Sequence, residues 1–100
     1  MIVTVSDKAE TDLEDIADWI AEDNPTRAGS FVVELLARCA TLSDHPKRFP
    51  EVRRTRWASI RKLTHKHYLI FYTVGPDSVT IARIVHGSRD WAAFIGDIQS

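Results

Sequence analysis

The residues best suited to contact a charged ligand lie in a short polar segment, HGSRD, at residues 86–90. His86 and Arg89 lie on either side of Gly87, so an imidazole and a guanidinium, which both donate hydrogen bonds to anions when charged, follow a predicted strand. The glycine lets the backbone turn where a side chain would clash. In the structural alternative, Asp90 caps a following helix and Arg89 pairs with an acidic residue of the first helix.

A third candidate, Arg83, lies in the middle of the predicted strand VTIARIV, where a charge is unusual. Side chains alternate between the two faces of a strand, so Arg83 is predicted to share a face with three apolar residues, Val79, Ile81 and Val85. A buried charge without a partner is costly. Arg83 therefore either reaches a carboxylate from a helix or points from a partly open face toward a partner, and the sequence leaves both alternatives open.

A fourth candidate, Arg61, lies on another predicted strand. Four residues are thus predicted to face a partner or a target: Arg61, Arg83, His86 and Arg89. Trp57 and Trp91, near the loop and the C-terminal helix, are predicted to be packing residues.

The sequence lacks the usual patterns of a catalytic or cofactor site. The four glycines are scattered, which excludes a glycine-rich phosphate loop, and no cysteine or histidine spacing matches a zinc site. The single cysteine, Cys39, lies on the apolar stripe of a predicted helix, where a core role is far commoner than a nucleophilic one. We therefore assign no catalytic residue and expect neither a cofactor nor a metal ion.

Two amphipathic helices are predicted in the N-terminal half of the chain. Residues 2–5 form a strand, after which Ser6 or Asp7 can cap a helix whose apolar residues recur at helical spacing. The second helix runs from about Pro25 to Leu42, with Asn24 as its N-cap. Each helix has one apolar face to bury.

The C-terminal half is predicted to be mainly β-sheet. Residues 44–57 form a long loop, and a strand from Ala58 to Leu63 precedes the hairpin YLIFYTV–GPDS–VTIARIV and a short helix at 90–95. The predicted order is β-α-α-β-β-β with a short C-terminal helix. This is an α+β fold in which the two helices pack on one face of a small antiparallel sheet. A chain of 100 residues is expected to form one domain, 1–100.

The composition, 44% hydrophobic and 27% charged, is that of a soluble globular protein. No apolar run approaches the roughly 20 residues of a membrane span, and the N-terminal residues lack the pattern of a signal peptide. With only one cysteine, the chain cannot form an internal disulfide. We therefore expect a cytoplasmic protein with no membrane partner.

The net charge of −1 hides a strong asymmetry. Residues 1–24 hold eight acids against one base, Lys8, whereas residues 47–66 hold eight bases against one acid, Glu51. In one interpretation these are two solvated faces that attract each other across the fold. In the other, the basic segment is a surface for an anionic partner, either nucleic acid or an acidic protein segment.

The chain resembles the RelE/ParE superfamily of toxins from bacterial type II toxin–antitoxin modules, closest to the ParE branch. Four segments in order carry the resemblance: AETDLEDIADWIAEDNP, LARCATLSDHP, YLIFYTV and VTIARIVHGSRD. The resemblance implies two N-terminal helices on a small antiparallel sheet. It also implies a co-expressed antitoxin, whose flexible C-terminal part wraps the toxin. An acidic antitoxin segment would suit the basic residues 47–66.

The two branches of the superfamily differ in target. The RelE-like members cut mRNA on the ribosome with lysine, arginine and tyrosine side chains. Lys62 and Arg89 match two of these positions, but Leu69 and Ile95 stand where an arginine and the tyrosine would be expected. The ParE-like members inhibit DNA gyrase and do no chemistry themselves.

We therefore predict a ParE-like toxin that inhibits DNA gyrase, is neutralised by its cognate antitoxin and is not an enzyme. Direct binding of nucleic acid is not expected without the antitoxin. Two alternatives stay open: a RelE-like ribosome-dependent mRNA endonuclease, and a non-toxic member that only regulates its operon.

Overall fold

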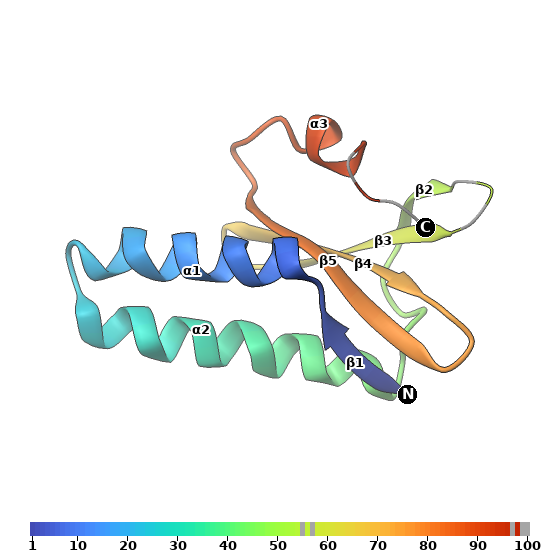
Figure 1. Cartoon of the computed structure of the whole chain (residues 1–100), viewed down its shortest axis with the longest axis horizontal. Coiled ribbons are helices and arrows are strands. Elements are labelled where there is room, and N and C mark those ends of the chain that lie inside the picture. Colours follow the sequence, from blue (N-terminus) through green and yellow to red (C-terminus); the bar gives the residue numbers. More distant parts are fainter. Residues whose placement is uncertain (55, 57, 97, 99–100) are drawn as a thin grey trace.

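The computed structural model describes residues 1–54, 56, 58–96 and 98. Trp57, predicted to be a packing residue, lies outside the described residues. The elements follow in this order: β1 (Ile2–Val5), α1 (Asp7–Ala21), α2 (Pro25–Ala40), the 3₁₀-helix η1 (Thr41–Ser43), β2 (Glu51–Arg54), β3 (Ser59–His65), β4 (Tyr68–Val74), β5 (Ser78–His86) and α3 (Trp91–Ile95). Figure 1 shows α1 and α2 side by side on one side of the sheet and α3 on the other.

Both long helices begin at residues whose side chains satisfy backbone amides that have no partner within the helix. Ser6 caps α1, since its Oγ accepts a hydrogen bond from the Ala9 amide at 3.1 Å. Asn24 caps α2 by accepting from the Arg27 amide at 3.0 Å, and Pro25 follows at the first helical position. Of the two caps that the sequence allowed for α1, the structure uses Ser6.

The five strands form one sheet in the order β1-β5-β4-β3-β2. The pairs from β5 to β2 are antiparallel, as predicted, but β1 lies parallel to β5, with Ile2 opposite Ser78 and Val5 opposite Ile81. The sheet is therefore mixed rather than purely antiparallel. The α+β class and the packing of two helices on one face are confirmed.

The sheet has one strand more than predicted, because β2 lies within the segment 44–57 that the sequence indicated as a loop. Its sequence EVRR shows no apolar alternation, and Val52 is the residue that packs against a core cluster. An edge strand needs a hydrogen-bonding partner on one side only, so β3 suffices to hold it. The pattern of apolar residues did not reveal it for this reason.

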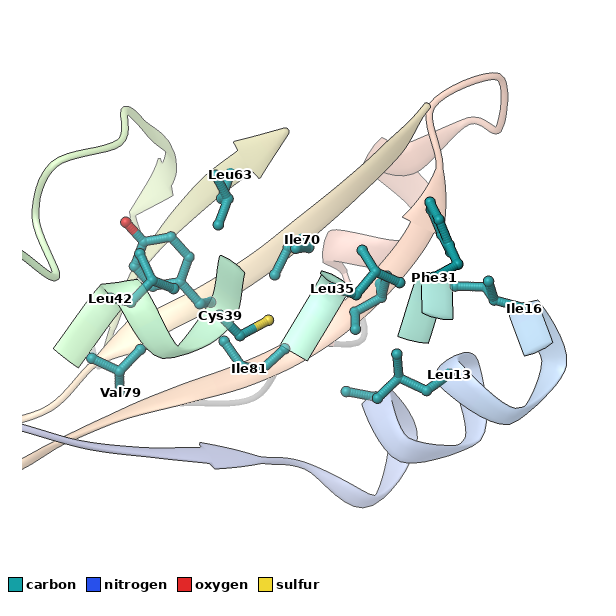
Figure 2. Packing of buried hydrophobic residues seen from close by; sticks show 13 residues of the cluster. Leu13, Ile16, Phe31, Leu35, Cys39, Leu42, Leu63, Ile70, Val79 and Ile81 are labelled. Carbon is teal, nitrogen blue, oxygen red and sulfur yellow. The ribbon is translucent and has the colours of Figure 1, made fainter. Parts of the chain in front are cut away.

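The main core lies between the two helices and one face of the sheet. Figure 2 shows side chains from the helices meeting those from the strands, among them Leu35 and Cys39 of α2 and Ile70 and Ile81 of the sheet. Cys39 is 2% exposed, as its place on the apolar stripe predicted, and burial raises the pKa of its thiol to about 11. A smaller second cluster on the other face joins four buried residues of the sheet, Ile60, Leu69, Phe71 and Val85, to Ile95 of α3.

A β-bulge at Ala82 changes which face the second half of β5 presents. Phe71 of β4 pairs with Arg83 and the next residue, Tyr72, pairs with Ile81, so Ala82 has no partner across the strands. Val79 and Ile81 face the helices, whereas Val85 packs in the second cluster. The prediction that Arg83 shares a face with Val79 and Ile81 is therefore wrong, because the extra residue interrupts the alternation.

The bulge is held by the residue that starts α1. The Ser6 hydroxyl donates to the Ala82 carbonyl at 2.9 Å, and the Ser6 amide donates to the Ile81 carbonyl at 2.9 Å. One serine thus caps a helix and satisfies a carbonyl that a bulge leaves without a strand partner.

Candidate functional site

Three of the four residues predicted to face a partner lie together in one cleft between α1, the end of β5 and α3. The cleft has a volume of about 670 Å³. Arg83, His86 and Arg89 line it beside aromatic residues and two carboxylates of α1, Asp12 and Asp15. Figure 1 shows the chain leaving β5 and turning toward α3 above α1.

Arg83 forms the floor of the cleft and is bound by Asp12. Its Nε and Nη2 donate to the two oxygens of the Asp12 carboxylate, each at 2.9 Å, and the two side chains are only 14% and 12% exposed. The Ile84 amide also donates to Asp12 Oδ2 at 2.9 Å. Since β1 pairs with β5 only as far as Ile81, the Asp12 carboxylate takes the place of a strand partner beyond that point. Of the two sequence alternatives for Arg83, the structure shows the carboxylate from a helix.

His86 stands at the mouth of the cleft, where its ring is oriented by its neighbours. The Ser88 amide donates to His86 Nδ1 at 3.1 Å, so the neutral imidazole carries its proton on Nε2. The ring stacks on His67 with centroids 6.0 Å apart and meets the edge of Tyr68 at 5.2 Å. The turn favours glycine at position 87, because a Cβ there would make a tight contact of 3.3 Å with the His67 carbonyl oxygen.

Arg89 is exposed on the rim of the cleft. Its guanidinium lies 5.9 Å from the centre of the Phe94 ring, and no carboxylate pairs with it among the described residues. Asp90 occupies the N-cap position of α3, but its side chain makes no capping hydrogen bond. The structural alternative for Arg89 and Asp90 therefore does not hold, and Arg89 presents its charge at the surface.

Arg61, the fourth candidate, is a structural residue on the other side of the molecule. Its Nη1 donates to the carbonyls of Lys47 at 3.2 Å and of Phe49 at 2.6 Å. The Tyr72 hydroxyl donates to the Pro46 carbonyl at 2.7 Å. These bonds fix the segment before β2 to the sheet, so Arg61 does not join the cleft.

The sequence did not reveal that Trp19 belongs to this site. Trp19 lies on α1 at the edge of the cleft and is 70% exposed. Its position among the acids, off the apolar stripe of Leu13, Ile16 and Ile20, was the available signal. The cleft combines an exposed indole, the half-buried Phe94 and two basic groups, and this mixture suits the binding of a polypeptide surface.

Two of the four residues at the endonuclease-like positions are buried, Leu69 and Ile95. Leu69 is 8% exposed and Ile95 is 3% exposed, and both belong to the second core cluster. The Lys62 ammonium lies over the ring of Trp91, 5.2 Å from its centre. Trp91 also packs against Phe71, as its predicted role in packing requires.

A second polar cluster joins α2 to the turn between β3 and β4. Glu34 of α2 accepts hydrogen bonds from Arg27 and from Lys66, the latter at 2.9 Å, and His65 Nε2 lies 3.6 Å from the same carboxylate. The hydrogen bonds from Arg27 and then Lys66 hold the pKa of Glu34 at about 2, below its usual value. Lys66 has a φ of 55°, as the tight turn demands.

The two charged segments lie at opposite edges of the sheet. The acidic helix α1 packs against β5 and pairs through Asp12 with Arg83, whereas the basic strand β2 is the last strand at the other edge. This arrangement does not support the interpretation that the two segments attract each other across the fold. The basic edge is therefore a surface that an anionic partner can reach.

Two general properties complete the description. Within the described part of the chain, no three His, Cys, Asp or Glu side chains come together in a way that could hold a metal ion. None of the described helices combines the length and the apolar character needed to cross a membrane.

Comparisons with known proteins identify a family for this chain and a solved structure with a similar fold. A model of the family described as the ParE toxin of the type II toxin–antitoxin system, parDE, matches residues 3–91. A solved structure, the chromosomal ParDE toxin–antitoxin system from P. aeruginosa, superposes with a TM-score of 0.73 at 20% sequence identity, covering 86% of this chain and 95% of that one. Because the two sequences are only 20% identical, this match shows that the two proteins share a fold. No curated protein sequence matches the chain.

Proposed function

Because the chain belongs to the ParE toxin family of type II toxin–antitoxin systems, we propose that it is a toxin that inhibits DNA gyrase and is neutralised by a cognate antitoxin. The observation that carries the proposal is the family match over residues 3–91, which includes both long helices, β1 from its second residue, the whole of β2 to β5 and the first residue of α3. The proposed place of action is the cytoplasm.

The side chains at the endonuclease-like positions support a toxin that inhibits by binding and catalyses no reaction. The positions that an RNA-cleaving relative would need, Leu69 and Ile95, are apolar and buried. An apolar side chain cannot stabilise developing charge on a phosphate or transfer a proton. His86 and Arg89 are the candidates proposed to contact the target, since Arg61 and Arg83 are engaged within the fold.

The proposal is tested by inducing the chain alone in bacteria and following DNA and protein synthesis separately. We expect DNA synthesis to fall first, with signs of DNA damage, and co-expression of the antitoxin to restore growth. An early fall in protein synthesis with cleaved mRNA would instead identify the endonuclease alternative. Normal growth in the presence of soluble, folded protein would identify a non-toxic regulatory member.

A second experiment asks whether the cleft contacts gyrase. The purified chain is titrated into a gyrase supercoiling assay, and the double variant His86→Ala/Arg89→Ala is compared with Lys47→Ala/Arg48→Ala, whose side chains lie in the exposed loop before β2. We expect the cleft variant to need at least about tenfold more protein for half inhibition, since truncating central contacts costs more than 1 kcal/mol. Equal potency of the two variants would place the contact with gyrase elsewhere.

A further inference from the structure

The outward face of α2, which points away from the sheet, is uncharged over its whole length. Val33 and Leu36 are the large aliphatic side chains on it, and they are 67% and 40% exposed. All residues of α2 are described, and its other exposed residues are Pro25, Thr26, Gly29, Ser30, Ala37 and Ala40. A helix on the surface of a soluble protein normally presents charged and polar side chains on its outer side. This face is therefore a candidate surface for another protein.

The three charged residues of α2 lie along one side of this face, next to the turn between β3 and β4. Glu34 binds Arg27 and also accepts a hydrogen bond from Lys66 at 2.9 Å. Arg38 Nη2 donates to the Thr64 carbonyl at 3.4 Å. This side of the face, which we call the basic flank, thus holds three cations, Arg27, Arg38 and Lys66, against one carboxylate.

The opposite side of the face is formed by α1 and is acidic. Asp12 binds Arg83 of β5, and Glu10 and Glu14 lie about 200° around α1 from Asp12, on the side toward α2. Both glutamates are exposed and define the acidic flank. Figure 1 shows that α1 and α2 run antiparallel. Glu10 lies 11 residues before the end of α1 and Leu36 lies 11 residues after the start of α2, so the two stand at about the same height.

Gly29 lies within the outward face and is not required by the fold of a single chain. A Cβ at this position would meet none of the described residues outside its own helical turn within 4 Å. Glycine in a helix interior is less favourable than alanine by about 1 kcal/mol. Glycine suits a place where another backbone comes close. Here that backbone would belong to a second molecule.

We propose that the outward face of α2 binds the same face of a second copy of this chain, with the two α2 helices parallel. In a two-fold pair of this kind the acidic flank of each copy lies against the basic flank of the other, and Glu10 stands near Arg38 of the second copy. Antiparallel helices in a two-fold pair would place flanks of like charge together. The uncharged face between the flanks lets the two helices pack closely. The opposite charges of the flanks thus favour a second copy as the partner.

The size of the face sets the strength of the pair. α2 has 16 residues and is about 24 Å long, and with the adjoining side of α1 the face is about 20 Å wide. Each copy would bury about 480 Å², which gives a total of about 1,000 Å², at the lower end for a specific interface. We therefore expect a dimer with a dissociation constant of about 10–100 μM.

The proposal goes beyond gyrase inhibition, because it holds whether or not the chain is toxic. The cleft between α1, β5 and α3 lies on the other side of α1 from α2, so both clefts of the dimer stay open. A dimer would bind a partner that has two equivalent sites more tightly than a single chain does.

The first test is sedimentation equilibrium of the full chain from about 5 to about 400 μM, a range that brackets the expected dissociation constant. The average mass should rise from 11.4 kDa toward that of two chains. Val33→Glu should weaken the dimer at least about tenfold, because it buries a charge at the centre of the interface. Glutamate is a better helix former than valine, so the variant should fold.

The matched control is Ile2→Glu. Ile2 is 69% exposed, and it points away from the long helices because Val3 packs against the main core. The control therefore replaces an equally exposed aliphatic residue with the same charge at a distant place. Its dissociation constant for the dimer should stay within about twofold of the unmodified chain.

Two further variants test the packing and the orientation. Gly29→Leu adds apolar surface to the face but fills the space that a second helix needs, so it should weaken the dimer at least about tenfold. Glu10→Lys should weaken it about three- to tenfold, since the contact with Arg38 occurs twice in a two-fold pair. The charge exchange Glu10→Lys/Arg38→Glu should restore most of this loss. Far-UV circular dichroism of each variant checks that the fold is retained.

A mass of one chain at all concentrations, with the protein folded, would overturn the proposal. Equal dissociation constants for Val33→Glu and Ile2→Glu would place the contact between copies elsewhere. Tighter association of Gly29→Leu would reduce the face to a non-specific apolar surface. If the charge exchange did not recover what Glu10→Lys loses, the parallel arrangement would be wrong.

Discussion

Replacing Asp12 with alanine should destabilise the protein far more than any other change on the acidic face of α1. The substitution leaves the Arg83 guanidinium, which is 14% exposed, without its carboxylate, and it also leaves the Ile84 amide without an acceptor. Removing one partner of a buried pair costs about 3–5 kcal/mol. Because a small part of each side chain stays in contact with water, we expect a loss at the lower end, about 3 kcal/mol.

Urea denaturation at pH 7, followed by circular dichroism, measures the free energy of unfolding. For a chain of this size a loss of about 3 kcal/mol corresponds to a fall in Tm of about 12–24 °C. The matched control is Asp15→Ala, which removes an equal charge from an exposed position one turn along the same helix. It should change the free energy of unfolding by less than about 0.5 kcal/mol.

A double variant shows how much of the destabilisation comes from leaving the Arg83 guanidinium without a partner. In Asp12→Ala/Arg83→Met the unpaired guanidinium is gone, and the double variant should be more stable than Asp12→Ala alone. The reasoning would be refuted if Asp12→Ala and Asp15→Ala gave the same free energy of unfolding. That result would mean that the carboxylate beside Arg83 and Ile84 contributes nothing that solvent cannot replace.

Three further predictions concern single side chains. The pKa of Glu34 is lowered to about 2 in the folded protein. Its contribution to stability is therefore present above its unfolded pKa of about 4.5 and is lost as the pH falls toward 2. In thermal melts between pH 4.5 and 2, Glu34→Gln should show a shallower decline of Tm than the unmodified protein. Tyr72→Phe removes the hydrogen bond to the Pro46 carbonyl and should lower the free energy of unfolding by about 1 kcal/mol. Amide exchange in residues 47–49 should become faster, and an unchanged exchange rate there would show that this hydrogen bond does not hold the segment in place. Ser6→Ala removes both the cap of α1 and the bond to the Ala82 carbonyl, and should lower the free energy of unfolding by about 1–2 kcal/mol in urea; a loss no greater than that of Thr11→Ala would contradict it.

The parts of the fold that follow from local patterns could be predicted. The stripes of Leu13 and Ile16 in α1 and of Phe31 and Leu35 in α2 define both helices, and the β-branched and aromatic segments define the hairpin. The strand β2 could not be predicted in this way, because hydrogen bonds to β3 hold it and burial of a regular face does not.

The site was predicted in part. His86 and Arg89 stand out as polar residues after a strand, and both line the cleft. The role of Arg83 depends on a bulge and on a carboxylate 71 residues earlier in the chain, and such a distant pairing leaves no local signal. Arg61 was predicted to face a partner, and the structure shows its guanidinium bonded to backbone carbonyls, which every residue has and which leave no signal in the sequence.

The bulge at Ala82 lets β5 carry one residue more than its side-chain pattern needs. Val79, Ile81 and Ile84 face the main core, and deleting Ala82 would bring them into strict alternation with Arg83 still on the other face. If all the residues were kept and the strand ran through this point without a bulge, Arg83 would turn toward the main core and Ile84 would leave it. A deletion of one codon at this position would therefore keep the interior and exterior of the strand unchanged, and it would remove the carbonyl that the Ser6 hydroxyl binds.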